Sequence, residues 1–166
     1  MPITQEERKE LLTYDNGKPI IITKNDRSET CEEYSLLVFV RTTASSTPEY
    51  VRSVSLRLLF PVDYPAASPS VFVRHGRLFH PNFTDDGQWV GSKIEDNESL
   101  SEYLMRLVRV LQYKEIDRNS IANRNAMVWY NKNKDSGLFP TDHINYSIKP
   151  RISIYRINEH AQTQPK

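Results

Sequence analysis

The chain has 166 residues, 38% of them hydrophobic, which is enough for one domain with a substantial core and too short to predict two. Lys and Arg number 22 against 21 Asp and Glu, so no overall field attracts nucleic acid or a membrane surface. There is no apolar run near the roughly 18 residues of a spanning helix and no signal-peptide pattern. The single Cys31 cannot form an internal disulfide. We therefore expect a soluble, cytoplasmic protein that binds neither nucleic acid nor membrane.

The N-terminal region predicts a short helix that ends at about Leu12. Thr4 with Glu7 three residues later has the spacing of a capping box, which satisfies free backbone donors in the first turn. The charged run 7–9 is expected to form a solvated face. Asn16-Gly17 then predicts a turn.

Four β-strands are predicted in the first half of the chain. Short loops join them, so we expect an antiparallel meander. Cys31 is expected to be a half-buried residue where the second strand opens, and the polar stretch Thr43 to Pro48 is expected to be a loop. Pro61 to Pro69 contains three of the prolines that remove ladder donors, so it predicts a stiff connection. The predicted strands are Ile20 to Lys24, Tyr34 to Thr42, Val51 to Phe60 and Ser70 to Arg74.

The second half of the chain changes to a helical period. Ser99 and Glu102 form a second capping-box pattern, and the apolar residues that follow recur at the spacing of a core-facing helix, with Arg106 and Arg109 on its outer side. Another helix is predicted from about Ser120, with an apolar stripe made of Ala122, Ala126, Trp129 and Tyr130.

The C-terminal part predicts an extended segment or edge strand, followed by a frayed tail. Pro150 interrupts a series of isoleucines, and the polar residues 159–166 have the composition of a disordered end. We therefore expect one domain over 1–158 and a disordered tail over 159–166. The isoleucines are Ile148, Ile152, Ile154 and Ile157.

The central stretch carries a motif in three parts. The pattern FPxDYPxxxPxV over 60–71 is followed by His80-Pro81-Asn82 and then by Gly87. This order resembles the core of the ubiquitin-conjugating enzyme family, and the resemblance extends from about residue 20 to residue 130. It implies an α+β fold with a four-stranded antiparallel meander, an N-terminal helix, a long central helix and a following helix.

The same resemblance bears on activity. In that family the nucleophilic cysteine stands ten positions after the first residue of the tripeptide, and counting from His80 leads to Val90. An aliphatic side chain supplies no thiolate to accept a modifier from a thioester. The chain therefore resembles the catalytically inactive ubiquitin-conjugating enzyme variants, with His80, Pro81 and Asn82 as a vestigial active-site segment. The resemblance implies that His80 organises a turn and that the Asn82 side-chain amide pins the adjacent loop.

Expected partners follow from the resemblance as well. A variant of this kind binds ubiquitin or a ubiquitin-like protein, an active conjugating enzyme, or both, without a covalent bond. The family's ligase-contacting Phe is replaced by Ala66, so ordinary ligase binding is not expected. Tyr64, Ala66 and Trp89 are the possible interface residues.

Two alternatives stay open. One is an active conjugating enzyme with an atypical acceptor, for which Ser92, Lys93 and Cys31 are the candidates. The other is a peptide-binding module that uses the groove beside the proline connection. No His pair has metal-ligand spacing and no phosphate-binding loop is present, so we expect neither a metal nor a cofactor. The sequence does not identify the modifier, the partner or the oligomeric state.

Overall fold

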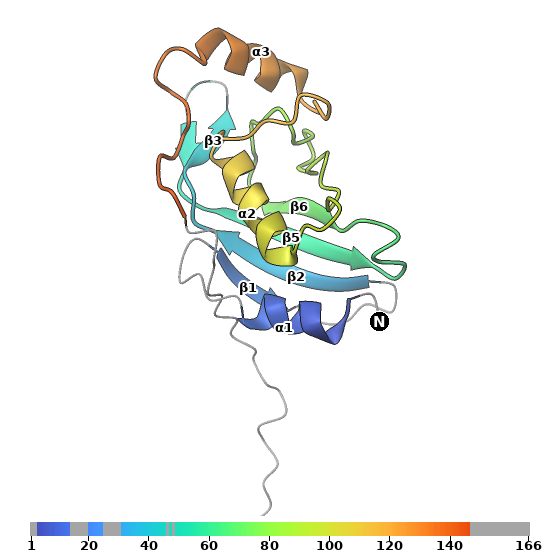
Figure 1. Cartoon of the computed structure of the whole chain (residues 1–166). Helices are drawn as coiled ribbons and strands as arrows, with labels where there is room; N and C mark the ends of the chain where they lie inside the picture. The colour runs from blue at the N-terminus through green and yellow to red at the C-terminus, as the bar shows by residue number, and fades with distance from the viewer. Residues whose placement is uncertain (1–2, 14–19, 25–30, 46, 48, 147–166) are drawn as a thin grey trace, which may run out of the picture.

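The computed structural model describes residues 3–13, 20–24, 31–45, 47 and 49–146. Helices and strands are both present, which makes the architecture α+β (Figure 1). The elements are α1 (Gln5–Thr13), β1 (Ile20–Lys24), β2 (Cys31–Val38), β3 (Thr42–Ser45), β4 (Glu49–Val51), β5 (Val54–Pro61), β6 (Ser70–His75), α2 (Leu100–Leu111) and α3 (Arg124–Asn133).

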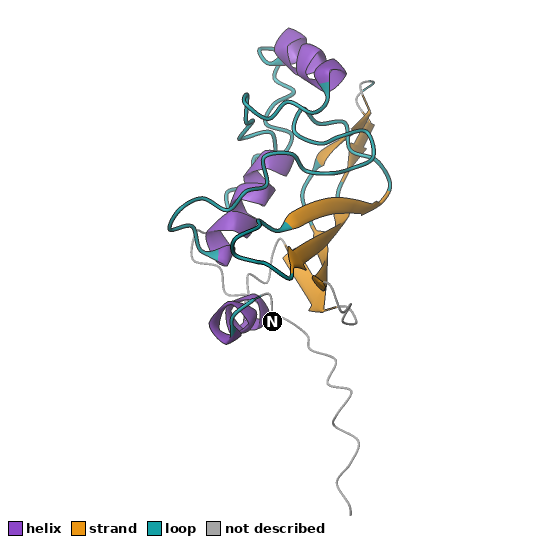
Figure 2. Ribbon diagram, turned by 90° about the vertical axis from the view of Figure 1, so that its right-hand side faces the viewer, coloured by secondary structure: helices purple, strands orange, loops and turns teal. Residues whose placement is uncertain are grey.

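The main sheet has four strands in the order β1-β2-β5-β6, and each neighbouring pair is antiparallel. This confirms the predicted pairing of the four strands. Helices α1 and α2 lie on one face of the sheet, whereas α3 lies beyond its end (Figure 2). The segment 87–89 pairs along the free edge of β6, because the N–H of Trp89 donates to the carbonyl of Val71 at 2.9 Å and the N–H of Val73 donates to the carbonyl of Gly87 at 2.8 Å.

Alternation along the strands places the core between the sheet and α2. Every second residue of β5 is buried, from Val54 to Phe60, and Leu36 pairs with Leu56 in the middle of the sheet. Helix α2 presents Leu104, Leu107 and other apolar residues to this face. Cys31 is half-buried at the first position of β2, as predicted.

The region predicted as a polar loop instead forms a hairpin of β3 and β4. Thr43 is fully buried there, and its hydroxyl donates to the carbonyl of Phe79 at 2.6 Å and lies 2.8 Å from the Tyr113 hydroxyl. These partners lie far along the chain, so residues with a loop-like composition are ordered by tertiary contacts. The hairpin takes up residues that were predicted in the second and third strands. Strand β2 therefore ends at Val38 and β5 begins at Val54.

Both predicted capping boxes are present. In α1 the backbone N–H of Glu7 donates to Thr4 Oγ1 at 3.1 Å and the N–H of Thr4 donates to the Glu7 carboxylate at 2.9 Å. In α2 Ser99 and Glu102 make the same reciprocal pair. Helix α3 begins later than predicted, because Asn123 is its N-cap and accepts from the Ala126 N–H at 2.9 Å.

Two arginines expected on solvated faces are buried. Arg8 is 8% exposed and makes two hydrogen bonds to the Glu32 carboxylate, at 2.9 and 2.8 Å. Arg106 is 9% exposed and pairs with Glu98. In both cases a carboxylate elsewhere in the chain makes burial of the guanidinium possible.

Several predictions fall on parts of the chain outside the described residues. These are the turn at Asn16-Gly17, the extended segment with Ile148, Ile152, Ile154 and Ile157, the domain end at residue 158 and the tail 159–166.

Candidate functional site

His80 is the centre of the turn that carries the predicted site. Its ring is fully buried, and Nδ1 accepts the backbone N–H of Asn82 at 3.0 Å. The proton therefore resides on Nε2, which donates to the carbonyl of Val110 at 2.8 Å. Burial lowers the pKa of His80 to about 3, against the opposing effect of that backbone hydrogen bond. A neutral ring with both nitrogens occupied ties the turn to α2 and has no free atom for acid or base chemistry.

Asn82 is buried as well, and its side-chain amide is fully used. Nδ2 donates to the carbonyls of Asp117 at 2.7 Å and Ser120 at 2.9 Å, while Oδ1 accepts the Asp117 N–H at 3.0 Å. An amide nitrogen has two hydrogens, and both are engaged. A developing oxyanion would have to displace one of these bonds. Pinning the loop 117–120 is the role that this geometry supports.

Val90 lies directly beside this turn. Its backbone N–H donates to the carbonyl of Asn82 at 2.8 Å, and the neighbouring Trp89 pairs with Phe83 in an antiparallel bridge. The Val90 side chain is half-buried. The structure thus brings His80, Pro81, Asn82 and Val90 together, although they are up to ten residues apart in the sequence.

The side chains of Asp117 and Ser120 also approach this turn, next to Gly91. Gly91 has a φ of +84°, and a Cβ built on it would lie 2.7 Å from Ser120 Oγ and 2.9 Å from Asp117 Oδ2. With Lys93 and the loop that follows, these residues border a cavity of about 360 Å³. Its lining residues are Gly91, Lys93, Ile94, Glu95, Asp96, Asp117 and Ser120.

The three candidate replacement acceptors differ in position. Ser92 is half-buried and its hydroxyl donates to the carbonyl of Pro69 at 3.4 Å, a group that cannot take up its proton. Lys93 is exposed to solvent. Cys31 is paired with Pro61 at the end of β2, on a different element from Asn82.

The possible interface residues do not share one environment. Tyr64 is half-buried, and its hydroxyl donates to Glu7 at 2.6 Å; Ala66 is exposed. Trp89 is only 2% exposed and lies against Phe83 and Tyr103, with ring centroids 6.5 and 5.4 Å apart. The interface prediction for Trp89 is therefore corrected: its side chain belongs to the core.

Arg106 is the main site residue that the sequence did not indicate. It makes two hydrogen bonds to the Glu98 carboxylate and donates to the carbonyl of Lys93 at 2.7 Å. Its guanidinium also lies 5.3 Å from the ring centres of Trp89 and Tyr103. These contacts hold the segment 91–98 that follows Val90 against α2. In the sequence, Arg106 is visible only as a charged residue next to the apolar Met105. That position alone does not indicate its pairing with Glu98.

Comparisons with known proteins show similarity to solved structures and to no protein-family model or curated protein. Among solved structures, S. cerevisiae Ubc12 is similar at 17% sequence identity with a TM-score of 0.47, over 88% of this chain and 93% of that one.

The described residues offer neither a metal site nor a membrane-spanning helix. Within them, no group of three or more His, Cys, Asp or Glu side chains is placed to hold a metal ion. None of the helices they form is both long and apolar enough to cross a membrane.

Proposed function

We propose that the chain is a ubiquitin-conjugating-enzyme-like domain that is catalytically inert and binds a ubiquitin-like modifier, or an active conjugating enzyme, without a covalent bond. The central motif, the antiparallel sheet and the long helix that follows support the class. The single observation that carries inertness is Val90: it donates its N–H to Asn82 at 2.8 Å, and its aliphatic side chain stands where the resemblance places the acceptor sulfur.

The chemistry supports the same conclusion. Transfer between thioesters needs an ionised sulfur as the nucleophile. The amide that would stabilise the tetrahedral intermediate is Asn82, and both of its donors are committed to backbone carbonyls of the loop 117–120. The turn keeps its packing role, but the chain has no thiol at position 90 and the Asn82 amide has no hydrogen left to donate.

Thioester formation tests inertness directly. The full chain is incubated with an activating enzyme, ATP and a modifier, and run on a gel with and without reducing agent. We expect no band that reducing agent removes. A reducible band that persists in wild type and disappears in Cys31→Ser would overturn the proposal. A hydroxylamine-sensitive band lost in Ser92→Ala, or a stable one lost in Lys93→Arg, would do the same.

Binding is tested separately from chemistry. ¹⁵N-labelled chain is titrated with ubiquitin, with other ubiquitin-like proteins and with active conjugating enzymes, and amide shifts are recorded. The proposal expects saturable shifts with at least one of them. Binding of short peptides with no shift by any modifier or conjugating enzyme would instead favour the peptide-binding alternative.

A further inference from the structure

Helix α3 lies beyond the end of the sheet and is packed on one side (Figure 2). Of its 10 residues, only Ala126 is buried. The ring of Trp129 packs against the rest of the chain, with its centroid 5.6 Å from that of Phe79 and 5.2 Å from that of Phe139. The side of α3 opposite to Ala126 and Trp129 therefore faces solvent.

Three exposed residues form a line on this outer side. Arg124, Val128 and Lys132 follow one another at intervals of four positions, which places them on the same face of a helix. Val128 is 67% exposed, and it is the large apolar side chain of α3 that lies open to solvent. At 1.5 Å per residue, Arg124 and Lys132 are about 12 Å apart along the helix axis. The outer side of α3 is thus an apolar residue between two cations.

The chain does not compensate these two cations. Neither Arg124 nor Lys132 makes a salt bridge or a side-chain hydrogen bond with any other residue that the structure describes. Lys134 adds a third positive charge at the end of the helix, against the single carboxylate of Asp135. The outer side of α3 therefore keeps a net positive charge.

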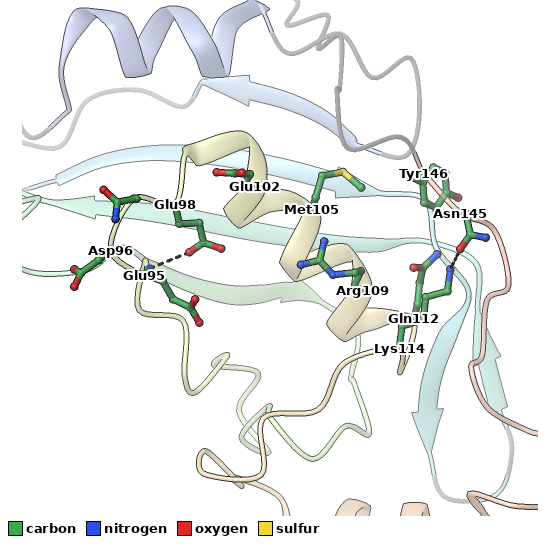
Figure 3. A pocket seen from close by; sticks show the side chains of 11 residues that line it. Glu95, Asp96, Glu98, Glu102, Met105, Arg109, Gln112, Lys114, Asn145 and Tyr146 are labelled. Carbon is green, nitrogen blue, oxygen red and sulfur yellow. Dashed lines mark hydrogen bonds between the residues drawn. The ribbon is translucent and has the colours of Figure 1, made fainter.

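The basic residues beside α2 differ in this respect. They line a groove of about 750 Å³ along that helix (Figure 3). Arg109 pairs there with Glu115 at 3.0 Å, and Lys114 Nζ donates to Asn145 Oδ1 at 3.0 Å and to the carbonyl of Ile144 at 2.6 Å. Because these charges have partners within the chain, the surface that suits an acidic partner is the one on α3.

The start of α3 is held in a fixed position. The carbonyl of Pro81 accepts the N–H groups of Ala122 and Asn123 at 2.8 and 3.0 Å, and Asn123 is the N-cap of the helix. These bonds attach α3 to the turn 80–82. A surface that is ordered before binding loses less entropy when a partner docks.

Other occupants of this surface fit its chemistry less well. If a second copy paired with it through α3, Arg124 would face Lys132 or Arg124 of that copy, and like charges repel. A helix that lies in a membrane interface buries a broad apolar face, whereas Val128 stands alone here and Trp129 is turned inwards. Nucleic acid requires a larger basic surface than a chain with 22 basic and 21 acidic residues supplies.

We propose that the outer side of α3 docks an acidic amphipathic helix of a partner protein. Two carboxylates of that helix, about 12 Å apart, pair with Arg124 and Lys132, and an apolar residue between them contacts Val128. The inference goes beyond the proposed function, because it concerns α3 and does not depend on whether position 90 is inert.

Titration of the ¹⁵N-labelled full chain with designed peptides tests the proposal. An Ala-rich helical peptide of about 20 residues carries Glu, Leu and Glu at positions i, i+4 and i+8. It should cause saturable shifts in the amides of Arg124, Val128 and Lys132. The control peptide has Lys in place of both Glu and should bind about tenfold more weakly, because two attractive charge pairs become repulsive. Equal affinities, or no saturable shift in α3 with the acidic peptide, would overturn the proposal.

Charge substitutions in the chain provide the matched comparison. Lys132→Glu should weaken binding of the acidic peptide several-fold, whereas Arg52→Glu makes the same change of charge at an exposed position between β4 and β5 and should not. Arg124→Glu combined with Lys132→Glu should reverse the preference, so that the Lys peptide binds more tightly than the Glu peptide. Equal weakening by Lys132→Glu and Arg52→Glu, or an unreversed preference in the double variant, would contradict docking on α3.

The same spectra distinguish the other occupants. Dilution of the free chain and addition of phosphatidylserine vesicles should both leave the α3 signals unchanged. Shifts in α3 that depend on chain concentration would assign the surface to a second copy. Loss of α3 signals with vesicles, prevented by Lys132→Glu, would assign it to a membrane. Either result would replace the proposed acidic helix.

Discussion

Two arginines of α2 carry the same charge in different surroundings. Arg106 is buried, pairs with Glu98 and donates to the carbonyl of Lys93. Arg109 is half-exposed and pairs with Glu115, both side chains being more than 40% exposed. Removing one partner of a buried pair leaves an uncompensated charge, whereas a surface pair contributes little. The pair of residues thus offers a matched comparison on one helix.

We predict that Arg106→Met lowers the free energy of unfolding by about 3 kcal/mol, because Glu98 and two carbonyl groups lose their donor. Arg109→Met should lower it by less than about 1 kcal/mol. Urea denaturation followed by circular dichroism measures both. Similar losses in the two variants would contradict the conclusion that Arg106 holds the segment 91–98 against α2.

Glu32 is the acidic centre of a second buried group. Burial raises its pKa, and hydrogen bonds from Arg8, Lys24 and Tyr34 outweigh this effect and lower the pKa from 4.5 to about 2. The group joins α1 to β1 and β2. Because the folded state holds the carboxylate in its charged form, the unfolded chain takes up the proton first as the pH falls.

We predict that this carboxylate contributes stability that is present above about pH 5 and lost as the pH falls towards 2. The shift from 4.5 to about 2 corresponds to about 3 kcal/mol. Glu32→Gln should therefore be less stable than wild type at pH 7, and the difference should shrink at pH 4 and pH 3 in urea denaturation. His80 titrates in the same direction in both proteins, so it cancels in the comparison. A difference that stays constant from pH 7 to pH 3 would refute the assignment.

The burial of Arg8 and Arg106 could not be predicted from the sequence. Helical spacing correctly places apolar residues of α2 in the core. It assigns charged residues to solvent because it contains no information on distant partners. Glu32 lies 24 residues from Arg8, and only the folded chain brings the two together.

At the scale of elements, strand β3 contains two adjacent buried threonines with different hydrogen bonding. The Thr43 hydroxyl donates to the carbonyl of Phe79 and contacts the Tyr113 hydroxyl. The Thr42 hydroxyl is buried and has no hydrogen-bond partner among the described residues. Burial without a partner costs free energy, whereas a satisfied hydroxyl stabilises the fold.

Valine has nearly the shape of threonine without the hydroxyl, so it separates the two cases. We predict that Thr43→Val lowers the free energy of unfolding by about 1–2 kcal/mol, since it also leaves the Phe79 and Tyr113 groups with fewer partners. Thr42→Val should be neutral or stabilising. Thermal and urea unfolding of both variants provide the measurement, and a larger loss in Thr42→Val than in Thr43→Val would reverse the assignment.

Elements that depend on local signals could be predicted from the sequence, whereas the hairpin of β3 and β4 could not. The capping boxes fix the starts of α1 and α2 through residues three positions apart, and such local signals are visible in the sequence. The hairpin of β3 and β4 depends on Thr43 meeting Tyr113, 70 residues away. Its composition is that of a loop, so no local signal indicates it.

At the scale of the whole molecule, the candidate site combines parts that differ in predictability. The turn 80–82 and Val90 follow from a motif with fixed spacing. Asp117 and Ser120 come from a loop about 35 residues later and reach the site because Asn82 binds their backbone carbonyl groups. The motif identifies Asn82 in the sequence. That Asn82 binds the loop 117–120 is seen only in the folded structure.

Aromatic contacts connect α3 to this assembly. The ring centroid of Trp129 lies 5.6 Å from that of Phe79 and 5.2 Å from that of Phe139. The ring centroid of Tyr113, just after α2, lies 4.3 Å from that of His80. Trp89, the other tryptophan, is inside the core. Fluorescence of Trp89 therefore reports on the core, and fluorescence of Trp129 reports on α3.

We predict that the chain unfolds as one cooperative domain. In Trp129→Phe the remaining fluorescence reports on the core around Trp89, and in Trp89→Phe it reports on α3. In each variant the urea midpoint from fluorescence should coincide with the midpoint from far-ultraviolet circular dichroism, because the contacts of Phe79 and Tyr113 couple α3 to the sheet. If fluorescence of Trp129 changed at clearly lower urea than the dichroism of the same variant, α3 would unfold separately, and the single domain predicted over 1–158 would have to be divided.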